Sequence, residues 1–214
     1  MPGPPELSAR AVALKPSLTL AIAAQAKALK NAGRDICSLS AGEPDFDTPD
    51  FIVEATRKAL RDGITRYGPA AGEPELRAAV AEKLSCTNGI ATTSEQVLIT
   101  NGGKQAIYNL FQVLLNPGDE VLLPAPYWLS YPEMAALAGA EVKLIPSQAE
   151  EGFRLDLEAL EAAISPRSRL LVLNTPGNPT GRVMPREELE AVAELVRRHP
   201  QLLVMSDEIY DFLL

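Results

Sequence analysis

The chain has 214 residues and a formal net charge of −8, with 46% hydrophobic and 22% charged residues, as in ordinary folded globular proteins. The negative charge argues against nucleic-acid or anionic-membrane partners, because backbone phosphates require a basic stripe. Two cysteines, Cys37 and Cys86, give neither a disulfide framework nor a metal-ligand spacing, and a lone histidine, His199, excludes a site built on several histidines. The longest apolar stretch, 18–24, is too short to span a bilayer, and the start lacks a secretion signal. We therefore expect a cytoplasmic chain with no metal site.

The first 45 residues are predicted to form an arm, a helix and a short strand. Ser17 is a candidate cap for the helix, and Gly33 would end it. A strand is predicted over 35–39, followed by an ordered loop over 40–49 that is rich in turn-forming residues. The helices predicted in the first half of the chain cover 18–31, 50–62 and 75–86.

From residue 96 onward, short apolar runs alternate with stretches of helical period. The predicted strands are 97–100, 120–123, 142–145, 170–173 and 202–205. The predicted helices are 104–115, 131–138, 157–164 and 186–198. Strands and helices that alternate in this way are typical of an α/β fold, in which helices cover both faces of a parallel or mixed sheet.

A candidate anion site follows the predicted strand 97–100. Gly102 and Gly103 precede a helix that begins at Lys104. Free amides and the dipole at a helix N-terminus favour an anion, and glycines let the backbone approach it closely. The spacing is not that of a dinucleotide or nucleotide-triphosphate loop, and a simple packing turn is the alternative.

Aromatic, amide and carboxylate side chains follow the next strands. Trp128, the only tryptophan, lies in a proline-rich loop and either stacks on a planar ligand or anchors the loop. Asn178 lies in a turn bracketed by prolines, where an Asx turn is the alternative to a ligand contact. Asp207 needs a partner at its strand end, which could be a helix cap, a metal or a protonated ring nitrogen. Because ligands bind at the carboxyl ends of parallel strands, we expect these groups and Tyr210 at one crevice.

Six segments, in this order, resemble the amino-terminal half of a fold-type-I, class I pyridoxal-phosphate (PLP) aminotransferase, close to bacterial and plastid-like aspartate aminotransferases. They are 39–49, 67–72, 102–104, 126–128, 174–181 and 206–210. The resemblance covers essentially the whole chain and implies a three-layer α/β/α large domain with a mostly parallel sheet, truncated before its end. It assigns residues 1–45 to an N-terminal arm and part of a small domain, and 46–214 to the incomplete cofactor-binding large domain.

The resemblance also implies contacts with PLP. Backbone amides of Gly102, Gly103 and Lys104 would bind the phosphate, and Trp128 would stack on the ring. Asp207 would keep the ring nitrogen protonated, which makes the ring an electron sink. Asn178 and Tyr210 would form hydrogen bonds with the phenolic oxygen of the ring.

Contacts with the amino-acid and 2-oxo-acid substrates are implied in the same way. Gly42 would contact the substrate carboxylate through its backbone, and Trp128 and Asn178 would also line the substrate site. The side chain of Lys104 would meet the distal carboxylate of an acidic substrate, with Ser17 or Thr19 nearby. Tyr67 would reach the phosphate bound by a partner subunit, which implies a homodimer with shared sites.

The implied activity of the intact protein is transfer of an amino group between aspartate or glutamate and a 2-oxo acid. Another fold-type-I enzyme, such as a β-lyase or a cyclopropane-forming synthase, is an alternative, and so is an aminotransferase for prephenate or aromatic acids. None of the seven lysines lies in the family's Schiff-base motif, so that lysine is expected beyond Leu214. The chain by itself is then expected to be an inactive fragment with an unpaired sheet edge.

Overall fold

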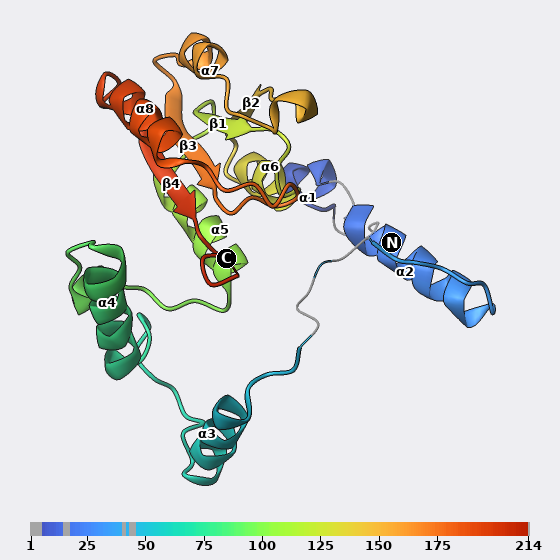
Figure 1. Cartoon of the computed structure of the whole chain (residues 1–214). Coiled ribbons are helices and arrows are strands. Elements are labelled where there is room, and N and C mark those ends of the chain that lie inside the picture. Colours follow the sequence, from blue (N-terminus) through green and yellow to red (C-terminus); the bar gives the residue numbers. More distant parts are fainter. Residues whose placement is uncertain (1–5, 15–17, 40–41, 43–45, 214) are drawn as a thin grey trace. The chain divides into compact units, whose positions relative to one another are not determined.

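The computed structural model describes residues 6–14, 18–39, 42 and 46–213. It divides into two compact units, which we call the sheet unit (1–14 and 100–214) and the helical unit (15–99). Figure 1 labels the α-helices and strands of both units. The predicted cap at Ser17 and half of the 40–49 loop lie outside the described residues.

The sheet unit is built on four parallel strands in the order β2-β1-β3-β4 (Figure 1). The strands are β1 (Glu120–Pro124), β2 (Glu141–Ile145), β3 (Ser168–Asn174) and β4 (Leu203–Asp207). The helices are α1 (Ala9–Ala13), α5 (Gly103–Leu114), α6 (Ser130–Leu137), α7 (Leu157–Ala163) and α8 (Arg186–Arg197), with a 3₁₀ turn η2 (Ala149–Glu151). In the register, Val121 lies opposite Val142 on one side and Leu170 on the other.

Two hydrophobic clusters cover the two faces of the sheet. Successive side chains of a strand point to opposite faces, so Val121 and Leu123 enter one cluster while Leu122 enters the other. The first cluster includes Phe111 of α5 and Met134 of α6, and the second includes residues of α7 and α8. The predicted α/β fold with helices on both faces is therefore confirmed for this unit.

The helical unit contains α2 (Leu18–Asn31), α3 (Asp50–Arg61), α4 (Pro74–Asn88) and the 3₁₀ turn η1 (Ser94–Gln96). Arg77 of α4 ties the following segment to its helix, because its guanidinium donates to the carbonyl oxygens of Val97 at 2.9 Å and Ser94 at 2.6 Å. The predicted helices of both units are confirmed to within about two residues at each end, the usual uncertainty of helix boundaries.

The predictions of strands at 35–39 and 97–100 are wrong, since both segments are irregular in the structure. A strand exists only when a neighbouring strand satisfies its backbone groups. Around 97–100, the backbone amide of Ile99 donates a hydrogen bond to the carbonyl oxygen of Ala71, and the carbonyl oxygen of Val97 accepts from an arginine side chain instead. The apolar composition of these runs therefore did not indicate strand pairing, and of their residues only Val97 is buried.

No helix in the described ranges is long and apolar enough to cross a membrane.

Candidate functional site

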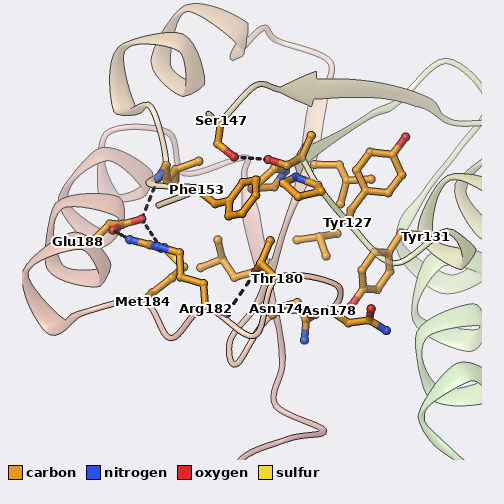
Figure 2. A pocket seen from close by; sticks show the side chains of 18 residues that line it. Tyr127, Tyr131, Ser147, Phe153, Asn174, Asn178, Thr180, Arg182, Met184 and Glu188 are labelled. Atoms are coloured by element: carbon orange, nitrogen blue, oxygen red, sulfur yellow. Dashed lines mark hydrogen bonds and ion pairs between the residues drawn. The ribbon is translucent and has the colours of Figure 1, made fainter. Parts of the chain in front are cut away.

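The chain leaves the carboxyl ends of β1 and β3 toward opposite faces of the sheet. The loop after β1 leads to α6, which packs with the first hydrophobic cluster, and the loop after β3 leads to α8, which packs with the second. Two adjacent parallel strands whose loops diverge in this way leave a crevice between their carboxyl ends. Figure 2 shows the pocket at this position, lined from both loops by Tyr127, Tyr131, Asn174 and Asn178 among others.

The loop after β3 is fixed by hydrogen bonds of its own side chains. Asn174 Nδ2 donates to the carbonyl oxygen of Asp207 at 2.9 Å, and Asn174 Oδ1 accepts from the amide of Asn178 at 2.8 Å. The backbone of Asn178 is thereby held in place, and its side-chain Nδ2 donates to the hydroxyl of Tyr210 at 3.3 Å. The peptide bonds that precede Pro176 and Pro179 are both cis. The structure therefore brings Asn178 and Tyr210 together, as the sequence predicted.

Asp207, at the end of β4, is paired with a residue that the sequence did not single out. The hydroxyl of Tyr131, on the first turn of α6, donates to Asp207 Oδ2 at 2.7 Å. Tyr131 is 2% exposed, and its burial, reinforced by the Asp207 carboxylate, raises the pKa of the phenol well above its usual range. The phenol therefore stays protonated at neutral pH and donates to the carboxylate. The other carboxylate oxygen of Asp207, Oδ1, accepts a hydrogen bond from the backbone amide of Ile209 at 3.2 Å.

Trp128 connects this pair to the N-terminus of α5. Its ring meets that of Tyr131 edge-on, with centroids 5.3 Å apart and planes at 86°. The ammonium of Lys104 lies 5.0 Å from the centroid of the Trp128 ring, a cation–π arrangement. A continuous series of contacts thus runs from Lys104 through Trp128 and Tyr131 to Asp207.

The α5 N-terminus has the backbone form that an anion site needs. Gly102 caps the helix with φ +82°, a conformation that glycine adopts readily and other residues do not. An added Cβ at Gly102 or Gly103 would meet no atom within 4 Å, so this face of the turn is open. The first amides of an α-helix have no intrahelical acceptor. The Gly102 amide, which precedes them, donates to the carbonyl oxygen of Thr100 at 2.9 Å, which leaves the amides of Gly103 and Lys104 for a ligand.

Seven of the nine predicted site residues therefore lie in the sheet unit, and two do not. The seven are Gly102, Gly103, Lys104, Trp128, Asn178, Asp207 and Tyr210. Gly42 and Tyr67 belong to the helical unit, where both are exposed. Thr19 lies in the first turn of α2 in the same unit, and Ser17 lies outside the described residues.

The pocket of Figure 2 overlaps this region only in part. It includes Tyr131, Asn174 and Asn178 but not Asp207, Tyr210 or Lys104, so it lies to one side of the predicted cofactor contacts. The donors and acceptors define the candidate site better than the pocket does, because a ligand is oriented by a few polar groups. Within the described ranges, no group of three or more His, Cys, Asp or Glu side chains could hold a metal ion.

Comparison with known proteins agrees with the chemistry of this region. The sequence profile of the family "Aminotransferase class I and II" matches residues 34–213. Aspartate/prephenate aminotransferase of Thermus thermophilus is 53% identical over 208 residues, which are 97% of this chain and 54% of that protein. A bifunctional aspartate aminotransferase and glutamate/aspartate-prephenate aminotransferase of Petunia hybrida is also 53% identical, over 97% of this chain and 43% of its own length.

The solved structures show the same relation. Aspartate aminotransferase from Thermus thermophilus, solved with maleate, has 51% identity and a TM-score of 0.94, over 98% of this chain and 55% of the other. The chain thus spans about half the length of the relatives it matches, and its fold is that of the fold-type-I PLP enzymes. The chain belongs to the class I and II aminotransferase family.

Proposed function

We propose that the intact protein transfers an amino group between an acidic amino acid, aspartate or glutamate, and a 2-oxo acid. The observation that carries the proposal is the arrangement in the sheet unit, where a carboxylate, an amide–phenol pair, an aromatic ring and a helix N-terminus lie on connected elements. The two relatives that are each 53% identical to this chain carry names of the same activity.

The donor set of the site fits PLP, the cofactor of this family. When bound, PLP supplies an electron sink for the substrate's α-carbon. Asp207 has the charge that a protonated ring nitrogen requires, and Tyr131 holds one of its oxygens in place. Asn178 and Tyr210 offer an amide and a phenol for an oxygen substituent on the ring. The open amides at the start of α5 suit a phosphate.

The residues of the chain itself then bind, orient and shield the cofactor and the substrate. Trp128 supports the ring on one face while its edge-on contact with Tyr131 keeps its own plane fixed. Lys104 places a positive charge beside that plane, where it attracts the phosphate or the distal carboxylate of an acidic substrate. Gly42 and Tyr67 are proposed to complete the site, the former at the substrate carboxylate and the latter from a partner subunit.

A homodimer and a cytoplasmic location are part of the same proposal. The full exposure of Tyr67 supports a role toward another subunit. The free and exposed thiols of Cys37 and Cys86 support a reducing compartment. We also propose the division into an arm with part of a small domain (1–45) and a cofactor-binding large domain (46–214).

Replacement of Asp207 tests the proposal. In the intact protein, Asp207→Asn is expected to lower kcat/KM for aspartate and 2-oxoglutarate about a hundredfold or more, because it removes a preorganised charge at the reacting group. Glu208→Gln is the matched control, since Glu208 is the exposed neighbouring carboxylate and its side chain accepts from Ser206 Oγ at 2.7 Å. Absence of glutamate formation by the intact protein, or equal activity of Asp207→Asn, would contradict the assignment.

Prephenate is a second candidate acceptor. It is favoured by the names of the Thermus thermophilus and Petunia hybrida relatives, both of which include it. The same assay, with prephenate in place of 2-oxoglutarate, separates the two acceptors.

A further inference from the structure

Arg182 and Glu188 form a buried ion pair beside the candidate site. Glu188 Oε1 lies 3.1 Å from Arg182 Nη1, and the second carboxylate oxygen contacts the second guanidinium nitrogen. The Glu188 side chain is 3% exposed and that of Arg182 is 20% exposed. Glu188 Oε1 also accepts from the amide of Leu155 at 3.0 Å, so the carboxylate is satisfied from two directions (Figure 2). Charges this well buried persist only when they are paired and hydrogen-bonded.

The main chain of Arg182 closes the loop that carries Asn178. Its carbonyl oxygen accepts from the amide of Gly177 at 2.9 Å, and its amide donates to Thr180 Oγ1 at 3.2 Å. Arg182 is therefore bound to the loop through its backbone and to α8 through its side chain. Glu188 extends the connection to the segment that precedes α7, through Leu155.

We propose that Arg182 and Glu188 are positioning residues, which hold the loop 177–182 so that the Asn178 amide faces the Tyr210 hydroxyl. The inference rests on the proposed function, in which Asn178 and Tyr210 contact the cofactor. The side-chain hydrogen bonds of the pair go to each other and to the Leu155 amide, so its proposed effect on the cofactor runs through Asn178. The loop's internal hydrogen bonds fix its shape, and the ion pair fixes that shape relative to the helices on this face of the sheet.

The test uses the double variant Arg182→Met/Glu188→Gln of the intact protein. A single replacement would leave one buried charge unpaired and destabilise the fold itself. The double variant removes both charges, and the amide side chain introduced by Glu188→Gln keeps an oxygen for the Leu155 amide. We expect its melting temperature to stay within about 5 °C of the parent. We expect PLP to bind about three- to tenfold more weakly by equilibrium dialysis, the usual effect of one lost hydrogen bond.

A second readout reports on the Asn178 contact itself. Hydrogen bonds to an ionised oxygen lower the pH at which it protonates. The pH midpoint of the bound cofactor's visible absorbance is therefore expected to rise by about 0.5 in the double variant. Arg182→Lys, paired with the native Glu188, is expected to restore part of both effects, because it returns the charge without the bidentate geometry.

A double-mutant cycle with Asn178→Ala decides how the pair acts. If it acts through Asn178, its effect on PLP affinity disappears in the Asn178→Ala background, whereas independent effects would add. Additive effects, or an unchanged affinity and midpoint in the Arg182→Met/Glu188→Gln protein, would overturn the inference and leave the pair a purely structural one. An unchanged affinity in Asn178→Ala alone would instead overturn the proposed cofactor contact, and the inference with it.

The matched control is the exposed ion pair of Arg198 with Glu161, which lies at 2.9 Å with side chains 60% and 51% exposed. It connects α7 to the end of α8 without contact to the loop. Its removal by Arg198→Met/Glu161→Gln is expected to change neither PLP affinity nor the absorbance midpoint.

Discussion

Tyr131 and Asp207 are 76 positions apart, and a 2.7 Å hydrogen bond joins them in the candidate site. No local pattern identifies such a pair, because Tyr131 reads in the sequence as one more apolar position of a helix. The positions of Asp207, Asn178 and Trp128 could be predicted, since each lies within four residues of the carboxyl end of a strand, at the edge where ligands bind. Tyr131 could not, because only the packing of α6 on the sheet determines which strand end its hydroxyl reaches.

Removal of that hydroxyl tests its contribution. Tyr131→Phe is expected to lower the free energy of unfolding of the intact protein by about 1.5–3 kcal/mol, as for hydrogen bonds to charged groups. It is also expected to weaken PLP binding, because Asp207 is then free to turn. Urea denaturation and dialysis measure the two effects. Tyr127→Phe is the control, since Tyr127 lines the same pocket and its hydroxyl points away from that of Tyr131 (Figure 2). Equal effects of the two variants would refute the role of Tyr131.

At the scale of elements, the N-terminus of α5 combines an open face with a backbone that favours glycine. Gly102→Ala is expected to cost about 1–2 kcal/mol in backbone strain, and to weaken PLP binding about fivefold or more because the new methyl group occupies the open face. Gly118→Ala is the matched control, since Gly118 has φ +89° and equally free space but lies before β1. Calorimetry should show similar strain in both variants, and loss of PLP affinity in both would contradict the proposed site.

The elements themselves could be predicted to a large extent. Helices such as α7 have local signals, here the cap Asp156, which accepts from the amide of Ala159 at 2.9 Å. The four paired strands could be predicted from apolar runs between helices. The runs at 35–39 and 97–100 carry the same composition, but no strand in the described part of the chain lies beside them, and pairing is a property of the assembled sheet. A short apolar run alone therefore overpredicts strands.

At the scale of the whole molecule, a buried carboxylate at the amino end of the sheet makes stability depend on pH. Glu120 is fully buried, with Ser165 Oγ at 2.6 Å, Lys143 Nζ at 2.9 Å and Arg167 Nη2 at 2.8 Å. Burial raises the pKa of Glu120, but the hydroxyls of Ser165 and Ser168 and the Lys143 ammonium outweigh it and lower the pKa to about 2. The contact with Arg167 is an ion pair without hydrogen-bond alignment.

The sign of the dependence follows from the lowered pKa. The stabilisation is fully present above the ordinary value of 4.5 and is lost as the pH falls toward 2. Glu120→Gln is expected to lower the free energy of unfolding at neutral pH by about 1–3 kcal/mol, and to flatten its decline between pH 4.5 and 2. Denaturation curves across this range measure both. Glu141→Gln, at an exposed carboxylate 3.5 Å from the same arginine, should leave the slope unchanged. Parallel curves for Glu120→Gln and the parent would count against the assignment.

The position of Trp128 also gives this chain an optical property. It is the only indole among the 214 residues, and it lies between the Lys104 ammonium and the edge of the Tyr131 ring. Indole emission depends on the charges and rings in contact with it, so the indole fluorescence of this chain reports on the candidate site and on no other region. Trp128 fluorescence thus provides a label-free signal for a ligand that binds between α5 and the end of β4.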